Sequence, residues 1–349
     1  MSTILLSGFT GNIGYEVAAQ LSAHRIRALV RHPASAPRLP HVAIRESLPD
    51  ALAEDTEIII HGAANTAFRA PLEDLRIDNV EGTRRLLEFA SRCPRLKKFI
   101  HISTACVSGD SQGLIPEAPL PPPVAFLNPY EQSKWEAEQV VLATDLPVQI
   151  IRLSIVAGSD QDGTVRRQGA LHHTLFWLWR GLIPMMPGAA DTPVDIISTE
   201  YAASFIAAAV HSPPRAESRI IHACAGEGAP RLGELLEHLR LEFSALSAAW
   251  RSGAILPPAL VDAATFRLFE STVQQSGDLL FQRVCGDAKS FLPSLLHPRV
   301  YQNHHAQALN PQPITDWRSL VTLVSRHVIE QHTRTSRDCR LPIGVAALG

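Results

Sequence analysis

The sequence is poor in cysteine, and its cysteines have no spacing that would organise a structural framework. Five cysteines occur among 349 residues, at positions 93, 106, 224, 285 and 339. Their number is odd and no two form a C-x-x-C pair, which argues against a set of disulfides and against a zinc knuckle. We therefore expect a protein of the reducing cytoplasm.

An excess of one charge and a long apolar run are also absent. The 32 basic and 34 acidic side chains leave a formal net charge of -2, so no basic field attracts nucleic acid or anionic lipid. The most apolar stretch, 175–186, contains Arg180, Gly181 and Pro184 and is shorter than the ~20 residues that span a bilayer. The chain begins with apolar residues at 4–6, which favours a first strand over a signal peptide. We expect a soluble protein without a membrane span.

The chain does contain enough apolar residues for a full core, in a regular alternation of strand-like and helix-like segments. Hydrophobic residues make up 46% of it, and its length suits one large domain or two closely associated ones. Up to about residue 160, β-rich runs alternate with helical periodicity, which is typical of βαβ units and a parallel sheet. The predicted strands are 3–7, 27–30, 41–45, 57–61, 98–103 and 147–153, and the predicted helices are 14–23, 72–93 and 129–143.

The second half of the chain has a less regular pattern. Ser198 or Thr199 could cap an alanine-rich helix there. Helices are predicted at 169–182, 198–210, 232–246 and 314–331, and strands at 192–197 and 220–225, the latter as the final strand. The predicted fold class is α/β, a Rossmann-like doubly wound parallel sheet with a smaller, mostly helical C-terminal region.

A cluster of glycines follows the first predicted strand, with the spacing G-x-x-G-x-x-G. Such a turn lets backbone amides approach a pyrophosphate at the start of the next helix. A tight connection without a ligand is the alternative, but the position between the first strand and a helix favours a nucleotide. The residues predicted to bind it are Gly8, Thr10, Gly11, Asn12, Ile13 and Gly14.

The end of the second strand predicts NADP rather than NAD. An acidic residue at this place binds the ribose hydroxyls of NAD, whereas an arginine accommodates the 2′-phosphate of NADP. The chain has Arg31 and no carboxylate here, with a solvated strand-end arginine as the alternative. After the fourth strand, Ala63 and Ala64 are small residues, which would let the backbone pass close to the adenosine half of the nucleotide. A packed turn without a ligand is the alternative.

A tyrosine and a lysine four residues apart, Tyr130 and Lys134, form the main candidate for catalysis. One helical turn separates them, so their side chains share a face. A neighbouring ammonium lowers the pKa of a phenol from ~10 and makes it a usable acid or base near neutrality. Thr104, at the end of its strand, would add a hydroxyl donor to a substrate oxygen. The spacing Y-x-x-x-K also occurs by chance.

Two other patterns are assigned no function. Residues 109–113 fit G-x-S-x-G, but that nucleophile stands on a sharp strand-to-helix turn, whereas a proline-rich loop follows here. The pairs His172-His173 and His304-His305 lack ligand spacing such as H-E-x-x-H, and adjacent side chains on a helix do not share a face. We therefore expect no metal.

As a set, these motifs resemble those of an extended short-chain dehydrogenase/reductase. Within that group, they are most similar to the motifs of thioester reductase domains and fatty acyl-CoA reductases. The resemblance covers about residues 1–228, with Leu153 in place of the usual proline. It is carried by segments 59–68, 79–83, 101–109, 128–138 and 152–158.

The resemblance assigns roles to particular residues. It implies that Thr104 orients the carbonyl, that Tyr130 donates the proton, and that Lys134 lowers the pKa of Tyr130 and holds the nicotinamide ribose. Asn79 should lie near the cofactor or a proton-relay water, with a helix-surface role as the alternative. The residues expected beside the nicotinamide are Ser154, Ile155 and Val156, and Ser103 is also expected to bind the cofactor.

The resemblance also implies a reaction and a division of the chain. We expect an NADPH-dependent reductase that converts an acyl thioester, bound to coenzyme A or to a separate carrier protein, to an aldehyde or further to the alcohol. A reductase, dehydrogenase or epimerase of ketones, hydroxy compounds or nucleotide sugars is the alternative, and a regulatory nucleotide-binding protein without turnover is a third. Residues 1–168, with 194–228 returning to them, should form the NADP-binding domain, and 169–349 the substrate-binding or lid region. The aromatic run at 175–179 suits an apolar wall over an acyl chain or a buried core helix.

Overall fold

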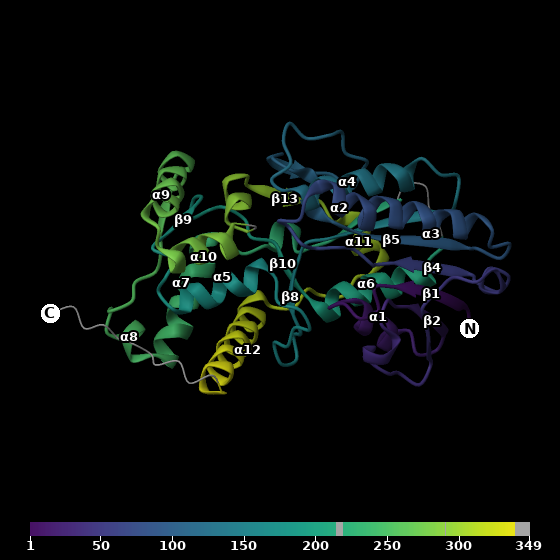
Figure 1. Ribbon diagram of the computed structural model, residues 1–349, viewed down its shortest axis with the longest axis horizontal. Helices are drawn as coiled ribbons and strands as arrows, with labels where there is room; N and C mark the ends of the chain where they lie inside the picture. Colours follow the sequence, from purple (N-terminus) through teal and green to yellow (C-terminus); the bar gives the residue numbers. More distant parts are fainter. Residues whose placement is uncertain (214–218, 290, 339–349) are drawn as a thin grey trace.

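A seven-stranded parallel sheet forms one side of the molecule (Figure 1). The computed structural model describes residues 1–213, 219–289 and 291–338, and Cys339 lies outside them. The strand order is β11-β7-β5-β4-β1-β2-β3, and every neighbouring pair is parallel. The chain reverses its direction of winding between β1 and β4, and the crevice at that switch point is where such sheets bind ligands. The strands are β1 (Thr3–Ser7), β2 (Arg25–Leu29), β3 (Val42–Arg45), β4 (Ile58–His61), β5 (Lys98–Thr104), β7 (Val148–Leu153) and β11 (Ile220–Ala223).

Helices cover both faces of the sheet, so its strands are apolar on both sides (Figure 1). Alternate residues of β1 enter different cores, because successive side chains of a strand point to opposite faces. Ile4 and Leu6 belong to the core under α1 (Gly14–Gln20) and α6 (Thr199–His211). Leu5 belongs to the core on the other face. That face is covered by α2 (Leu72–Leu75), a π-helical turn η3 (Arg76–Glu81), α3 (Gly82–Ser91) and α4 (Pro129–Leu142).

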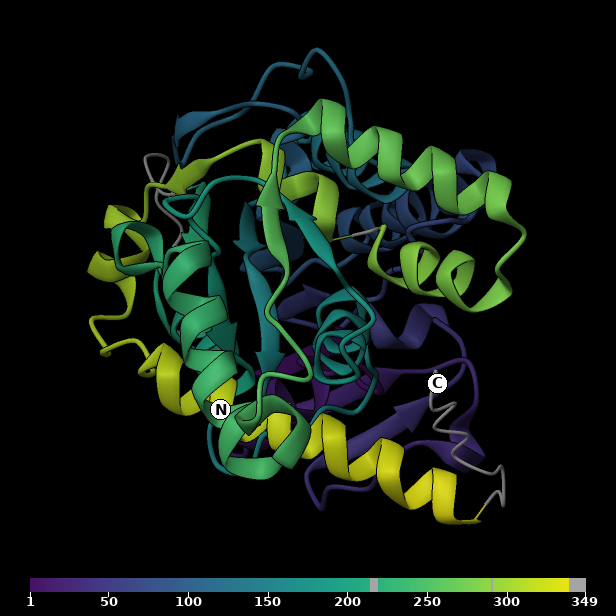
Figure 2. The same cartoon turned by 90° about the vertical axis from the view of Figure 1, so that its left-hand side faces the viewer.

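The second half of the chain builds a separate helical core beside the sheet (Figure 2). Its centre is α5 (Ala170–Trp179), which contacts both α12 (Trp317–Asp338) and α10 (Leu279–Ala288). The other members are α7 (Leu232–Leu246), α8 (Ala248–Arg251), α9 (Ala263–Ser276) and the 3-10 turn η7 (Leu292–Leu296). The hairpin of α9 and α10 carries three exposed leucines, Leu268, Leu279 and Leu280.

Three two-stranded sheets tie distant parts of the chain together. These pairs are β8 (Ile155–Gly158) with β10 (Ile196–Ser198), β9 (Met185–Pro187) with β12 (Ala259–Val261), and β6 (Gly113–Ile115) with β13 (Arg299–Tyr301). After β13, α11 (His304–Leu309) packs against β11 and α6, so a late segment of the chain returns to the large sheet. The remaining 3-10 turns are η1 (Pro33–Ser35), η2 (Asp50–Leu52), η4 (Ala105–Ser108) and η6 (Gly226–Gly228).

The predicted fold class is confirmed. Most differences lie in the second half, although the short strands β6 and β8 in the first half were not predicted either. Ser198 caps α6, since its hydroxyl accepts a hydrogen bond from the backbone N–H of Tyr201 at 3.0 Å. The strand predicted at 192–197 is shorter and later, and the prediction that 220–225 holds the final strand is wrong, because β12 and β13 follow. Three-residue strands whose partners lie far away in sequence leave no periodic signal. The boundary at residue 168 stays a prediction.

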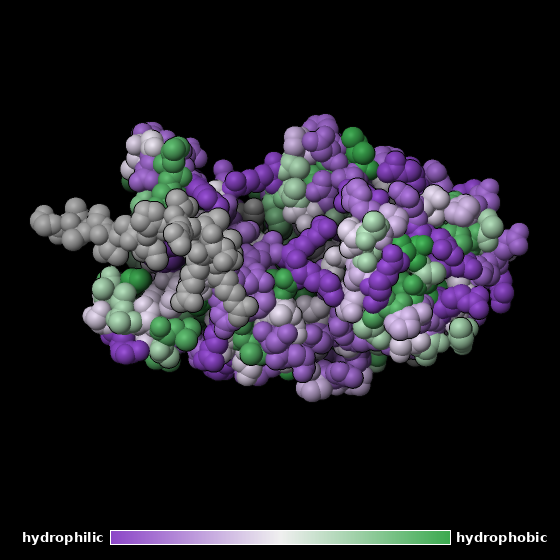
Figure 3. All heavy atoms as spheres, turned by 60° about the horizontal axis from the view of Figure 1, so that its bottom comes forward, coloured by the Kyte–Doolittle hydropathy of each residue, from purple (hydrophilic) through white to green (hydrophobic). Residues whose placement is uncertain are grey.

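The outer surface is mixed in character. The face turned to the viewer in Figure 3 is mostly hydrophilic, with hydrophobic atoms in separate groups. No helix in the described ranges is both long and apolar enough to cross a membrane.

Candidate active site

A cavity of about 740 Å³ opens at the carboxyl ends of the central strands. It collects nearly all of the residues that the sequence predicted for the site, from segments spread over the first 156 residues. The predicted residues that line it are Gly8, Thr10, Gly11, Asn12, Ile13, Gly14, Arg31, Ala63, Ala64, Ser103, Thr104, Tyr130, Lys134, Ser154, Ile155 and Val156. Asn79 is the exception among them.

The glycine loop makes one end of this cavity. Gly8 has φ +85°, and a Cβ on it would lie 2.5 Å from the carbonyl carbon of Gly62. A Cβ on Gly14 would overlap the carbonyl oxygen of Gly8. Only glycine permits such close approach of backbone segments. The loop therefore presents bare backbone at the start of α1, as a pyrophosphate site requires.

Asn12 holds this loop to a distant segment. Its Nδ2 donates to the carbonyl oxygen of Arg167 at 3.0 Å, and its Oδ1 accepts from the N–H of the same residue at 2.7 Å. Arg167 and Arg69 line the cavity as well. Sequence reasoning missed both arginines, because neither belongs to a recognisable motif.

Arg31 stands at the mouth of the cavity, two residues after β2. Its side chain is exposed. In the described part of the chain no hydrogen bond or ion pair engages it. The guanidinium is therefore free to meet an anion, although a solvated arginine would look the same.

Tyr130 lies in the first turn of α4, where local sequence begins the helix. The Asn128 side chain accepts a hydrogen bond from the N–H of Glu131 at 3.0 Å and so caps α4, with Pro129 at its first position. The Tyr130 ring packs edge-on against Phe68, with ring centroids 4.9 Å apart. Phe68 also lines the cavity, so it restricts where the phenol can point.

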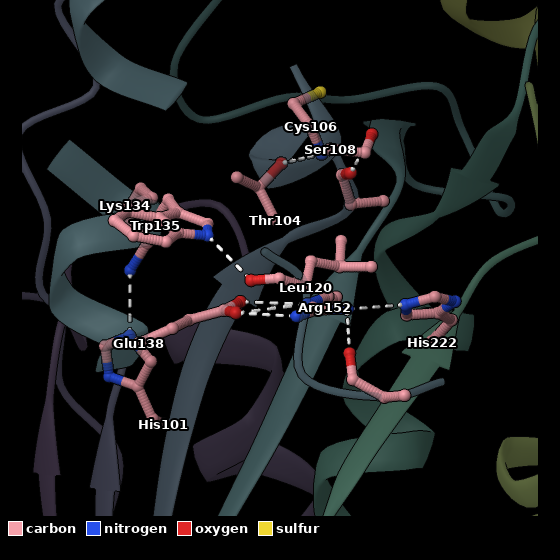
Figure 4. A network of polar contacts seen from close by, with 12 residues as sticks. His101, Thr104, Cys106, Ser108, Leu120, Lys134, Trp135, Glu138, Arg152 and His222 are labelled. Atoms are coloured by element: carbon pink, nitrogen blue, oxygen red, sulfur yellow. Dashed lines mark hydrogen bonds and ion pairs between the residues drawn. The ribbon is translucent and has the colours of Figure 1, made fainter. Parts of the chain in front are cut away.

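Thr104 is available to donate a hydrogen bond. Its Oγ1 accepts from the backbone N–H of Cys106 at 3.2 Å, which leaves the hydroxyl proton for another acceptor. Figure 4 shows this contact at the end of β5, near Lys134 on α4. Thr104, Tyr130 and Lys134 all face the same cavity.

Lys134 is buried and held by two acceptors. Its Nζ donates to the carbonyl oxygen of Ile102 at 2.8 Å. The same Nζ lies 3.3 Å from Nε2 of His101, a contact that Figure 4 shows. Burial lowers the pKa of Lys134 to about 8, although the carboxylate of Glu138 acts in the opposite direction. The ammonium therefore begins to titrate within the range in which enzymes are assayed.

The pKa of Tyr130 differs from the sequence expectation. Burial raises it above its ordinary value, with Cys106 and Glu131 acting in the same direction. The ammonium of Lys134 is directed to Ile102 and His101, so it does not hold the pKa of the phenol down. A phenol that stays protonated at neutral pH still suits a proton donor.

His101 was not anticipated, and its protonation pattern follows from its neighbours. It is fully buried, and desolvation holds its pKa well below the ordinary range, so it is neutral. Because its Nε2 accepts from the ammonium, its Nδ1 carries the proton, and that nitrogen has no hydrogen-bond partner among the described residues. An unpaired buried donor costs about 1–3 kcal/mol. In the sequence, the only signal for His101 is its place on a strand two positions before Ser103. Only the fold directs its ring to Lys134.

Asn79 lies behind the cavity wall. It is 1% exposed, its Oδ1 accepts from the N–H of Asn65 at 2.7 Å, and its Nδ2 donates to the Asn65 carbonyl oxygen and to Ser133 Oγ. It therefore holds the loop after β4 against α4. The helix-surface alternative is wrong, and a direct cofactor contact stays a prediction.

The other end of the cavity is formed by the helical region. Its lining includes Gly169 to His173 around the start of α5, together with Gly286, Asp287, Phe291 and Ser294. The aromatic run at 175–179 does not line it. Leu175, Trp177 and Leu178 are buried in the helical core, as is Met186, so the core-helix alternative is correct.

The G-x-S-x-G pattern is not a nucleophile turn. Ser111 lies between η4 and the short strand β6, and no helix follows it directly. His172 is buried, and both of its ring nitrogens make hydrogen bonds to the backbone. Its Nδ1 accepts from the N–H of Gly169 at 3.0 Å, and its Nε2 donates to the carbonyl oxygen of Ala157 at 2.7 Å.

Comparisons with known proteins show what the chain is similar to. The family model described as "Male sterility protein" matches residues 35–206. Glycine betaine reductase ATRR of Emericella nidulans is 32% identical over 162 residues, which are 43% of this chain and 13% of that protein. Fatty acyl-CoA reductase 2 of Arabidopsis thaliana is 36% identical over 80 residues, 23% of this chain and 13% of that protein. A 4-hydroxy-2-methyl-3-oxo-4-farnesyl-3,4-dihydroquinoline-1-oxide ketoreductase of Stigmatella aurantiaca is 30% identical over 170 residues, 44% of this chain and 50% of that protein.

A solved structure extends the similarity to the whole fold. The terminal R domain from the myxalamid PKS-NRPS biosynthetic pathway superposes with a TM-score of 0.75 at 22% identity, over 95% of this chain and 91% of that one. The chain spans half or less of the length of the curated relatives named above. The predicted similarity to thioester reductase domains and fatty acyl-CoA reductases is confirmed.

Proposed function

We propose that this chain, an oxidoreductase of the short-chain dehydrogenase/reductase type, uses NADPH to reduce an acyl thioester to an aldehyde. The observation that carries the proposal is one continuous cavity with the glycine loop at one end and Thr104, Tyr130 and Lys134 further along it. Side chains at Gly8 and Gly14 would overlap neighbouring backbone, so glycine is needed for a loop that presents bare amides at the start of α1. The residues present therefore fit a dinucleotide. The hydride is the chemistry that the nucleotide supplies when bound.

The chain's own residues would stabilise the charge that develops on the substrate. The hydroxyl protons of Thr104 and Tyr130 can both be donated to the carbonyl oxygen as it becomes an oxyanion. Lys134 keeps a positive charge beside them at neutral pH, since its pKa is about 8. Collapse of the tetrahedral adduct then breaks the carbon-sulfur bond and releases thiol and aldehyde.

NADPH, rather than NADH, is proposed from the charge at the cavity mouth. Arg31 is exposed there without a carboxylate partner among the described residues, and its fork of donors suits a phosphate.

The acyl group would arrive as a coenzyme A ester or on a separate carrier protein. The names of the fatty acyl-CoA reductase relative and of the R domain support an acyl thioester over other carbonyl compounds. A second round of reduction would convert the aldehyde to the alcohol.

The second candidate is reduction of a ketone or a related carbonyl compound. The ketoreductase of Stigmatella aurantiaca favours it, because the same threonine, tyrosine and lysine serve both reactions. A regulatory protein without turnover is disfavoured by the intact catalytic trio.

The deciding experiment follows NADPH and thiol together. With a panel of coenzyme A and carrier-bound thioesters, loss of NADPH absorbance should be matched by one free thiol per thioester and by an aldehyde that a hydrazine reagent traps. If the product is the alcohol, two NADPH should be consumed for each thiol released. Turnover of a ketone or nucleotide sugar without any thiol from the panel would replace this proposal with the second candidate.

A further inference from the structure

A carboxylate and two imidazoles meet outside the cavity, beside the edge strand β11. Glu117, from the proline-rich loop after β6, points its side chain at the start of α11, where His304 and His305 are the first two residues. The loop and the helix are 188 residues apart in sequence. None of the three residues lines the active-site cavity.

The carboxylate is held in a defined orientation. Its side chain has no exposed surface. Oε1 accepts from the backbone N–H groups of His222 at 2.8 Å and Ala306 at 3.1 Å, and Oε2 accepts from the N–H of His305 at 2.6 Å. These bonds already satisfy the start of α11. A carboxylate oxygen has two lone pairs, so Oε2 keeps one for a further ligand.

Both imidazoles direct Nδ1 toward that oxygen. Nδ1 of His304 lies 3.6 Å from Oε2 and Nδ1 of His305 lies 3.7 Å from it. These separations are too long for hydrogen bonds. Nδ1 of His305 is buried and has no hydrogen-bond partner in the part of the chain that the structure describes. The three atoms all lie within 4.8 Å of one another.

The separations are close to those that a tetrahedral metal ion requires. Zinc bonds of about 2.0–2.1 Å to nitrogen and oxygen place neighbouring ligand atoms roughly 3.3–3.4 Å apart. A movement of a few tenths of an ångström would close the two measured distances. His304 is 62% exposed, so water can reach a fourth position.

From the sequence we expected no metal, because the side chains of two adjacent histidines on a helix point in different directions. Here the pair lies at the first turn, and the third group comes from outside the helix. The two rings are 4.1 Å apart between centroids, at 61° to each other. Only the return of residues 299–310 to the large sheet brings the two histidines to Glu117.

We propose that Glu117, His304 and His305 bind one divalent ion of the zinc class through Oε2 and the two Nδ1 atoms, with water completing the coordination. The ion clips the proline-rich loop to the segment that carries β13 and α11. An ion that binds only the folded state stabilises that state by mass action. The ion takes no part in the reduction.

The test uses the full chain without a histidine tag, freed of metal by a chelator that is then removed. A calorimetric titration with zinc chloride should show one ion bound per chain. The melting temperature of the protein should rise when zinc is added. Changes to second-shell residues weaken metal sites by roughly 10–100-fold, so loss of a ligand in His304→Ala or His305→Ala should weaken binding at least ~10-fold. The His211→Ala variant is the control, since it removes an exposed histidine at the end of α6.

The variants separate a lost ligand from a lost fold. His304→Ala leaves the Glu117 hydrogen bonds to backbone amides intact, so its melting temperature without zinc should equal that of the wild type. Absence of saturable zinc binding by the wild type, or equal binding by wild type and both variants, would overturn the proposal. Equal loss in the His211→Ala control would show adventitious binding only and would overturn it as well.

Discussion

The two ends of the active-site cavity are built in different ways. The nucleotide end is made of backbone, by a glycine loop within seven residues of sequence and by small residues after β4. The opposite end is made mainly of side chains from α5, α10 and η7, and the lining residues of α5 lie more than 100 residues before those of α10 and η7. A ligand that contacts backbone leaves a readable motif, whereas a ligand that contacts assembled side chains does not. Five changes test this difference, from the largest expected effect to the smallest.

The glycine loop should tolerate no side chain. In Gly14→Ala the new Cβ would overlap the carbonyl oxygen of Gly8, so we expect loss of measurable NADPH binding by fluorescence titration. Gly228→Ala is the control, because its Cβ would meet nothing within 4 Å and its φ is not positive. A Gly14→Ala protein that binds NADPH normally would contradict the assignment of this end.

Removal of the proton donor should affect turnover and spare binding. Tyr130→Phe should lower turnover by ~10²-fold or more, as expected when a positioned acid is lost, with NADPH binding unchanged. Lys134→Ala should impair both. Tyr201→Phe, which removes the hydroxyl of a buried tyrosine outside the cavity, should leave turnover normal. Near-normal turnover of Tyr130→Phe in a chemistry-limited assay would exclude the scheme.

The preference between the two nucleotides should depend on Arg31. A lost charge-assisted hydrogen bond costs about 1.5–3 kcal/mol, so Arg31→Ala should bind NADPH roughly 10–100-fold more weakly. Binding of NADH should barely change. Arg45→Ala, at the end of the neighbouring strand β3, is the matched control. Equal use of NADH by the wild type, or equal loss of both nucleotides in the variant, would show that Arg31 has another role.

The pH dependence should report the protonation state of Lys134. Its pKa is lowered to about 8, so the ammonium is present below that pH and is lost as the pH rises through it. We expect kcat/KM to fall over the same range. In Lys134→Arg the guanidinium stays charged, so any residual activity should lose this decline.

Lys98 provides an internal control for the pH experiment. Burial lowers its pKa to about 8 as well, but its Nζ donates to the carbonyl oxygens of Ala209 and Ser212 away from the cavity. Lys98→Arg should keep the alkaline decline. If that variant loses the decline and Lys134→Arg keeps it, the titrating group has been misassigned.

The smallest effect is expected at the substrate end. His173 lines the cavity at the start of α5 and is partly exposed. His173→Ala should change the KM for thioesters by only about 5-fold, since a single contact at the low end of the range for such pockets is worth about 1 kcal/mol. NADPH affinity should stay constant. A change in NADPH affinity instead would remove the distinction between the two ends.

Most of the large sheet could be predicted, whereas most of the helical region could not. The strand predicted at 3–7 is β1 to the residue, because buried parallel strands are continuous apolar runs between turn signals. The short strands β12 and β13 were missed, since three residues carry no periodicity. The predicted roles of Thr104, Tyr130 and Lys134 remain untested, although the fold does bring them to one cavity.

The sequence by itself determined most strands of the large sheet, the glycine loop and the helical spacing of Tyr130 and Lys134, because each depends on residues close together in the chain. Only the tertiary structure decided that His101 holds the ammonium of Lys134, that burial raises the pKa of Tyr130, and that Glu117 reaches His304 and His305. These features depend on desolvation and on contacts between distant segments, and both arise only when the chain has folded.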